Sequence, residues 1–402
     1  MQSRFHYGWV IVGTGTLIVM ACLGFGRFAL GMLLPAMGEA LDLSYSQMGL
    51  ISTGNFAGYL IAVILSGRLY SILGAKRIIV SGLLLSALTM AVVSRASGFW
   101  QVFIPYVLTG VGSGAAFVPV MALVSHWFKK SHRGRAAGSI VIGAGVAFII
   151  SGWFIPYVNA WVGTEGWRTN WMILGGASFA VALVAVALLK DTPEQIGLSP
   201  LGTDPVQSLG ADALSRRLSP KKAILILGGL YFFFGYTYVI YATFIVTTLV
   251  QEVGMTETVA GHTWMWIGAF SLLSGPVFGW LSDKLGRRAA LSTVFGFQLV
   301  SYLFIAFNSG MWMIFLSVAF YGVALWAIPG IMAATVGDYM GPQKAALAFG
   351  TITIFFGAGQ VLGPAAAGVL ADWSGSFTYG YLMAAGMAGI AIVGTKLLPA
   401  RS

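Results

Sequence analysis

Uncharged apolar segments of about 18 or more residues recur along almost the whole length of this 402-residue chain. Each such segment is long enough to cross the hydrocarbon core of a bilayer as a helix. Charged residues make up 8% of the chain, whereas soluble domains carry about 25%. The pattern therefore predicts an all-α integral membrane protein and excludes a soluble globular fold.

The apolar segments predict twelve membrane-spanning helices. We expect them at about residues 8–37, 46–67, 78–94, 99–127, 136–161, 169–189, 223–250, 258–281, 289–307, 310–336, 345–370 and 375–395. If the N-terminus is cytoplasmic, every Lys and Arg except Arg27, Arg95 and Arg168 falls in a cytoplasmic loop or terminus. Because cytoplasmic loops are enriched in basic residues, we expect both termini in the cytoplasm and a multi-pass protein of the cell inner (cytoplasmic) membrane.

The composition also limits the partners of the chain. The formal net charge of +10 is explained by the basic cytoplasmic loops, so we expect no nucleic-acid partner. Cys22 is the single cysteine, which leaves no disulfide framework and no Cys-based metal centre. We expect no cofactor and no metal, the lipid bilayer as the surrounding solvent, and a monomer.

A duplication is visible along the chain. Residues 191–222 are rich in Pro, Gly, Ser and charge, which predicts a flexible cytoplasmic linker between an N-terminal six-helix bundle, residues 1–190, and a C-terminal one, residues 223–402. When the chain is laid over itself with Gly74 on Gly286, eight pairs of glycines coincide, and Gly110 with Gly322 is another of these pairs. The sequence therefore predicts two pseudo-symmetric bundles that descend from one six-helix unit.

Two loops carry a family resemblance. GRLYSILGAKR at residues 67–77 and GWLSDKLGRR at 279–288 resemble the G-x-L-x-D-x-x-G-x-x-R loop of the major facilitator superfamily (MFS). The first copy departs from the pattern, with Ser71 in the acidic position. The resemblance implies twelve helices that operate by alternating access. Four charged residues of these loops are candidates for a cytoplasmic gate, with a plain topology signal as the alternative: Arg68, Arg77, Asp283 and Arg287.

Two further segments narrow the resemblance to a branch. WFKKSHRGRAAG at residues 127–138 and DTPEQIGL at 191–198 are similar to segments of the monocarboxylate and oxalate/formate exchanger branch. That branch carries a substrate-binding arginine in the eighth span, where this chain has His262 as its one deep ionisable residue. The sequence also resembles related bacterial transporters that share the pattern GFGRF at residues 24–28.

Arg27 is the basic residue that lies well inside a predicted span. A guanidinium near the bilayer centre costs roughly 3 kcal/mol and is expected to face a cavity or a partner. The predicted topology places no carboxylate at this depth, and an arginine fork suits a carboxylate, sulfonate or phosphate. We therefore expect Arg27 to bind an anionic substrate; carbonyls, hydroxyls and water around a structural arginine are the alternative.

Other polar groups at cavity depth are further candidates for the substrate site. When Gly24 is laid over Gly235, Tyr238 aligns with Arg27, and Tyr241 lies on the same helical stripe as Tyr238. Packing or interhelical hydrogen bonds are the alternative role for all of these residues. Substrate contacts are expected from Arg27, Asn55, Tyr106, Tyr238, Tyr241, His262, Trp326 and Gln360. His262 is either a proton carrier or an ordinary interfacial histidine.

These features together predict a secondary active transporter and no enzyme. We expect it to move a small, monocarboxylate-like organic anion by rocker-switch alternating access, as a proton symporter or an anion exchanger. Arg27 would attract the anion from an aqueous cavity between the two bundles. The nearest alternative is an MFS efflux transporter of a neutral or amphipathic small molecule; a membrane sensor or integral-membrane enzyme has no supporting motif.

Overall fold

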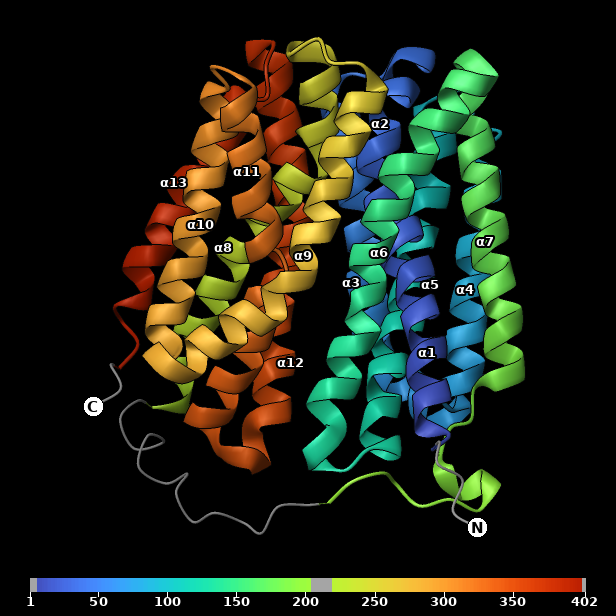
Figure 1. Ribbon diagram of the computed structural model, residues 1–402, viewed down its shortest axis with the longest axis vertical. Coiled ribbons are helices and arrows are strands. Elements are labelled where there is room, and N and C mark those ends of the chain that lie inside the picture. The colour runs from blue at the N-terminus through green and yellow to red at the C-terminus, as the bar shows by residue number, and fades with distance from the viewer. Residues whose placement is uncertain (1–5, 204–218, 400–402) are drawn as a thin grey trace. The chain divides into compact units, whose positions relative to one another are not determined.

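The computed structural model of the protein describes residues 6–203 and 219–399, and nearly all of this part is helical (Figure 1). Eleven helical stretches within it are long and apolar enough to cross a membrane, and one of them, Lys130–Leu188, contains two helices. The described chain therefore has twelve spans, and the all-α membrane fold predicted from the sequence is confirmed. Residues 204–218, within the predicted linker, lie outside the described residues.

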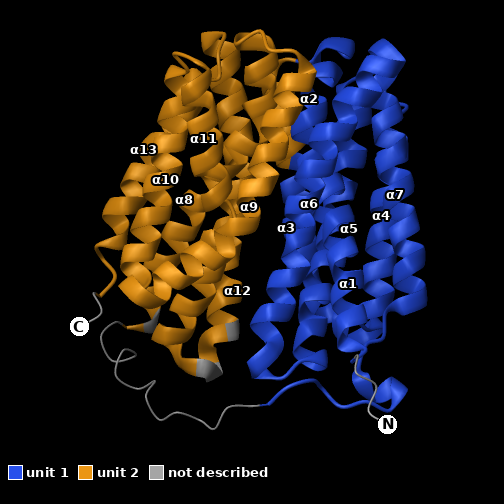
Figure 2. Cartoon of the chain, in the orientation of Figure 1, with its two compact units in different colours: residues 1–43, 54–207 blue, residues 44–53, 208–402 orange. Residues whose placement is uncertain are grey.

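The chain divides into two compact units (Figure 2). Unit 1 comprises Met1–Leu43 with Gly54–Gln207, and unit 2 comprises Ser44–Thr53 with Ser208–Ser402. Helix α3 therefore contributes its first turns to unit 2 and the rest of its length to unit 1. Backbone amides explain this division, because Tyr45 N and Ser46 N donate to the Asp372 carboxylate of unit 2, at 2.8 and 3.0 Å.

Unit 1 is built from six membrane-length helical rods. Helix α4 packs against α5 and α7, and α6 packs against the first rod. The elements are α1 (Gly8–Val19), the π-helix η1 (Met20–Phe28) and α2 (Ala29–Ala40), which form one continuous rod, followed by α3 (Tyr45–Leu73), α4 (Ala75–Val93), α5 (Phe99–Trp127), α6 (Lys130–Val162), the short η2 (Gly163–Glu165), α7 (Gly166–Leu188) and η3 (Pro193–Ile196).

Unit 2 repeats this plan. Helix α8 packs against α12, and α10 packs against α11 and α13. The elements are α8 (Pro220–Thr247), the π-helical η4 (Thr248–Glu252), α9 (Glu257–Leu285), α10 (Arg287–Phe307), α11 (Met311–Ala324), α12 (Ala327–Ser374) and α13 (Thr378–Thr395). The range of α12 comprises two helices that meet at a kink in the predicted loop, where Gly341 has the non-helical angles φ 69° and ψ 165°. Glycine adopts this conformation without the clash that a Cβ would bring.

The glycine repeat has a structural counterpart. Gly74 and Gly286, which the repeat pairs, both precede a helix with nearly the same backbone angles, φ 76° and ψ 165° against φ 85° and ψ 162°. A Cβ on Gly110 would collide with the carbonyl of Asn55, and a Cβ on Gly322 would lie 3.0 Å from the carbonyl oxygen of Ile267. Asn55 and Ile267 are themselves paired by the same shift, so the same pair of helices approaches closely in each unit.

Candidate functional site

Arg27 lies in the middle of unit 1, on the π-helical turn η1 of the first rod. Its side chain is buried, with 6% exposure. A π-helical stretch inserts extra residues into a helix and is found frequently at functional sites, because it turns a side chain away from the regular helical stripe. The sequence predicted an uninterrupted helix here, since hydrophobicity does not distinguish π from α geometry.

The guanidinium of Arg27 rests on two aromatic rings of α3. Its Cζ lies 3.8 Å from the centroid of the Tyr59 ring and 4.7 Å from that of Phe56. Such cation–π contacts stabilise a desolvated cation by about 2 kcal/mol. Both rings lack a formal negative charge, so they hold the guanidinium in place without neutralising it.

One edge of the Arg27 guanidinium has no hydrogen-bond partner among the described residues. Its Nε and Nη2 are buried and have no hydrogen-bond partner in the described part of the chain. Ion pairs among the described residues join Arg168 to Glu165 and Arg287 to Asp283 and Asp338, so none neutralises Arg27. Nε and Nη2 form one edge of the guanidinium, and their two parallel N–H bonds match the two oxygens of a carboxylate.

Asn55 and Tyr106, both predicted for the site, lie beside Arg27 and hold its backbone. The Tyr106 hydroxyl donates to the Arg27 carbonyl oxygen at 2.8 Å. The Asn55 amide donates through Nδ2 to the carbonyls of Gly26, at 3.2 Å, and Tyr106, at 3.1 Å. Because π-helical backbone is irregular, these side-chain hydrogen bonds stabilise the turn that carries the guanidinium. Tyr106 therefore positions Arg27 through its backbone.

Phe56 and Tyr59 were missed by sequence reasoning. The sequence signal for the role of Tyr59 is its spacing from Asn55. Residues three and four apart lie on the same face of a helix, and Tyr59 follows Asn55 by one turn. Aromatic residues are abundant in this chain, at 14%, so the spacing alone did not distinguish these two rings from packing residues.

In unit 2, the predicted residues Tyr238 and Gln360 contact each other directly. The Gln360 Nε2 donates to the Tyr238 hydroxyl, and the Gln360 Oε1 is buried without a hydrogen-bond partner among the described residues. The Tyr321 hydroxyl donates to the Tyr238 carbonyl oxygen at 2.7 Å. This contact is similar to the one from Tyr106 to Arg27 because the accepting carbonyls belong to residues that the repeat aligns, although the donors do not align: Tyr106 is paired with Val318.

The other candidates in unit 2 have contacts of different kinds. Tyr241 stacks on Tyr321, with centroids 4.0 Å apart, and shares a hydrogen bond with the hydroxyl of Ser317 at 2.8 Å. His262 is exposed on the second turn of α9. Trp326 immediately precedes α12, and its backbone N–H donates to the Ser274 hydroxyl at 3.0 Å.

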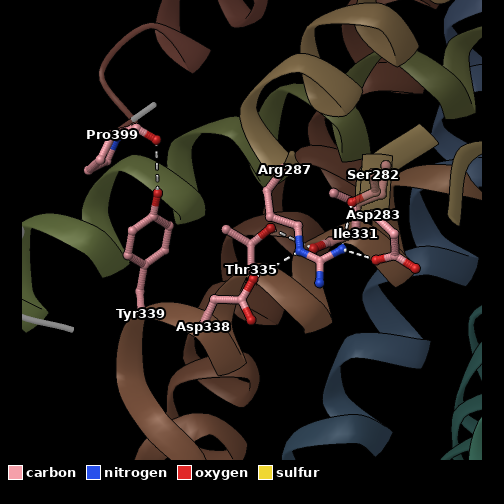
Figure 3. Close-up of polar contacts among 8 residues, drawn as sticks. All are labelled: Ser282, Asp283, Arg287, Ile331, Thr335, Asp338, Tyr339 and Pro399. Atoms are coloured by element: carbon pink, nitrogen blue, oxygen red, sulfur yellow. Dashed lines mark hydrogen bonds and ion pairs between the residues drawn. The ribbon is translucent and has the colours of Figure 1, made fainter. Parts of the chain in front are cut away.

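The predicted gate residues separate into a paired and an unpaired set. Arg287 joins helices α9, α10 and α12: its guanidinium contacts the carboxylates of Asp283 and Asp338, each at 2.9 Å, and the Ser282 hydroxyl at 2.8 Å (Figure 3). All of these residues belong to unit 2. In contrast, the ion pairs among the described residues include neither Arg68 nor Arg77.

The residues that flank the second branch-like segment, Lys190 and Leu201, bind the first residue of the other one, Trp127, in unit 1. Trp127 Nε1 donates to the Lys190 carbonyl at 3.0 Å, and the Leu201 N–H donates to the Trp127 carbonyl at 3.0 Å. The carboxylate of Asp191 accepts from the Lys76 N–H at 2.7 Å, at the start of α4. Asp191 therefore supplies a carboxylate to the loop in which Ser71 replaces the usual acid.

Twelve spans in two related units, with a buried arginine that pairs with no carboxylate of the described residues, define a membrane transport protein of the MFS fold. A sequence model of the family described as "Uncharacterised MFS-type transporter YbfB" matches residues 19–395, and the chain belongs to this family. The resemblance seen in its sequence is thereby confirmed. The protein is a multi-pass membrane transporter rather than an enzyme.

Individual relatives agree with this assignment. The chain is 24% identical to the hexuronate transporter of Bacillus subtilis, over 90% of this chain and 88% of the relative. It is 22% identical to monocarboxylate transporter 2 of Homo sapiens, over 94% of this chain and 82% of the relative. The crystal structure of the nucleoside transporter NupG superposes with a TM-score of 0.74 and 16% identity, covering 98% of this chain and 99% of that one. This last likeness concerns the fold alone.

Proposed function

We propose that the protein moves a small, monocarboxylate-like organic anion by alternating access, with Arg27 as the group that binds the anionic head. The observation that carries the proposal is the buried Nε/Nη2 edge of Arg27, which has no hydrogen-bond partner in the described chain. Leaving a buried charged donor unpaired costs more than the roughly 1–3 kcal/mol of a neutral one. A ligand that arrives with a carboxylate removes this cost by forming two charge-assisted hydrogen bonds.

The charge balance of unit 1 supports an anion over a cation. A cationic substrate would be repelled by Arg27, and a transporter of cations needs an acidic side chain to neutralise its cargo. No acidic residue forms an ion pair with Arg27 in the described structure. Relatives named for hexuronate and monocarboxylate transport are consistent with an acidic substrate.

Energy coupling is either proton symport or anion exchange. His262 is exposed near the start of α9, so in proton symport the acid itself is the simpler proton carrier; in anion exchange, a second anion returns in place of the proton. We place the protein in the inner membrane of a bacterial cell with both termini in the cytoplasm, on the distribution of its basic residues.

Transport by purified protein in liposomes tests this proposal. Uptake of labelled lactate, oxalate and methanesulfonate is measured with and without an inward proton gradient. We expect saturable uptake of at least one acid, strong loss of it in Arg27→Gln, and retention in the control Arg168→Gln, whose arginine pairs with Glu165 at 2.6 Å. Transport of a cation or a neutral compound, together with no uptake or exchange of any acid, would reject the proposed substrate class.

A further inference from the structure

The side-chain amide of Asn55 has one possible orientation. Its Nδ2 donates to two backbone carbonyl oxygens, those of Gly26 and Tyr106. Reversing the amide would place Oδ1 against the same two carbonyl oxygens, where no hydrogen is available to either partner. Oδ1 is therefore fixed as an acceptor that faces away from both carbonyls.

This acceptor is buried and unused. The Asn55 side chain is 1% exposed, and its Oδ1 has no hydrogen-bond partner among the described residues. An unpaired buried acceptor costs about 1–3 kcal/mol, as much as most single mutations. Such an atom calls for a donor that the chain itself does not supply.

The acceptor belongs to the same helix, α3, as the two rings that hold the guanidinium of Arg27. Asn55 and Tyr59 are one turn apart on the same face of α3, which separates them by roughly 5.4 Å along the helix axis. The guanidinium lies 3.8 Å from the Tyr59 ring, and Asn55 bonds to the carbonyl of the residue before Arg27. Two unpaired donors and one unpaired acceptor thus border one small region of unit 1.

We propose that the transported acid carries a hydroxyl group close to its carboxylate, and that this hydroxyl donates a hydrogen bond to Asn55 Oδ1. The proposal rests on the function proposed above, in which Arg27 binds the carboxylate. Asn55 is then the specificity-determining residue that separates hydroxy acids from their deoxy counterparts. An amino group is the wrong donor here, because an ammonium would lie beside the guanidinium and repel it.

Competition between acids in liposomes tests this inference. Lactate, propionate and alanine share a three-carbon skeleton and differ at the second carbon, and each is used to inhibit uptake of a labelled acid. We expect lactate to inhibit at about tenfold lower concentration than propionate, the ratio that one additional hydrogen bond supplies. Alanine is expected to inhibit less than lactate.

Variants assign the preference to Asn55. In Asn55→Leu, which has no acceptor, the lactate-to-propionate ratio should fall to about one, whatever the change in the affinity for both acids. The matched control is Tyr106→Phe, which removes the hydrogen bond to the Arg27 carbonyl and leaves the Asn55 amide in place, so its ratio should stay near that of the wild type. Asn55→Ala, which also has no side-chain acceptor, is a second variant if Asn55→Leu does not fold.

The possible outcomes are distinguishable. Equal inhibition by lactate and propionate in the wild type, or a preference for alanine, overturns the inference and leaves acid transport standing. An unchanged ratio in folded Asn55→Leu or Asn55→Ala also overturns it. Failure of all acids to compete, with uptake of a non-acidic compound, instead rejects the proposed function itself.

Discussion

Replacing Arg27 by Met should make the protein more stable and stop its transport activity. Removing a cation from lipid depth recovers roughly 3 kcal/mol, and losing the contacts with the two rings of α3 costs about 2 kcal/mol. The net gain of about 1 kcal/mol corresponds to an increase in the melting temperature of roughly 2–4 °C for a unit of this size. Met also keeps the apolar length of the arginine stem.

Whereas the stability of Arg27→Met should rise, its affinity for the transported acid should fall. Arg27 offers two charge-assisted hydrogen bonds to the anion, each contributing about 1.5–3 kcal/mol, so their loss should lower the affinity for the acid at least about 100-fold. The affinity of Arg27→Lys for the acid should lie between those of Arg27→Met and the wild type, because an ammonium keeps the charge but cannot form the bidentate hydrogen bonds of the guanidinium edge.

The assay combines thermal unfolding of the detergent-purified protein with uptake into liposomes. Arg168→Met is the matched control, since Arg168 pairs with Glu165 and donates to the carbonyl of Ala96. We expect it to lower the melting temperature and to leave uptake intact. The reasoning is refuted if Arg27→Met unfolds at a clearly lower temperature than the wild type, or if it transports the acid at the wild-type rate.

Two further predictions concern contacts within unit 2. Asp372→Ala removes the carboxylate that binds the first amides of α3, a contact of about 1–2 kcal/mol. A Cys introduced at the buried Met48 in a Cys22→Ala background reports the loss: it should react with a maleimide about tenfold faster when Asp372 is replaced than when it is present. An unchanged rate contradicts this prediction. Asp338→Asn breaks one of the two ion pairs of Arg287, and because both partners are partly exposed, it should lower stability by less than about 1 kcal/mol. Thermal unfolding should show this loss at low salt and a smaller one at about 1 M KCl, whereas an equal loss in both would argue against an electrostatic origin.

Much of the fold was predictable because the bilayer restricts a chain to few solutions. Backbone polar groups in lipid must be satisfied within the segment, so a long apolar run becomes a helix whatever its neighbours are. The repeat that pairs Gly110 with Gly322 in the sequence reappears as the same close helix contact in both units. The kink at Gly341 falls in the loop that the sequence predicts between the spans 310–336 and 345–370, whereas the π-helical turn at Arg27 was not predictable, since it depends on local backbone geometry that leaves hydropathy unchanged.

The candidate site was predictable in part. Arg27 was identified because its charge is anomalous at its depth, and Asn55 and Tyr106 were identified as polar groups in neighbouring spans. Their roles needed the structure: Tyr106 binds a backbone carbonyl, and Asn55 holds two carbonyls with one end of its amide while the other stays unpaired. Sequence spacing relates residues on the same helix, whereas these hydrogen bonds join three helical elements, η1, α3 and α5.

By itself, the order of residues decided that this chain crosses a membrane twelve times, that its halves are related, and that one arginine lies at lipid depth. Those conclusions follow from the cost of exposing charge and backbone to hydrocarbon, which is a local property of each segment. Tertiary structure alone decided which atoms of Arg27 and Asn55 have partners and which do not. Hydrogen bonding is directional and short-ranged, so it depends on how helices distant in the sequence come together.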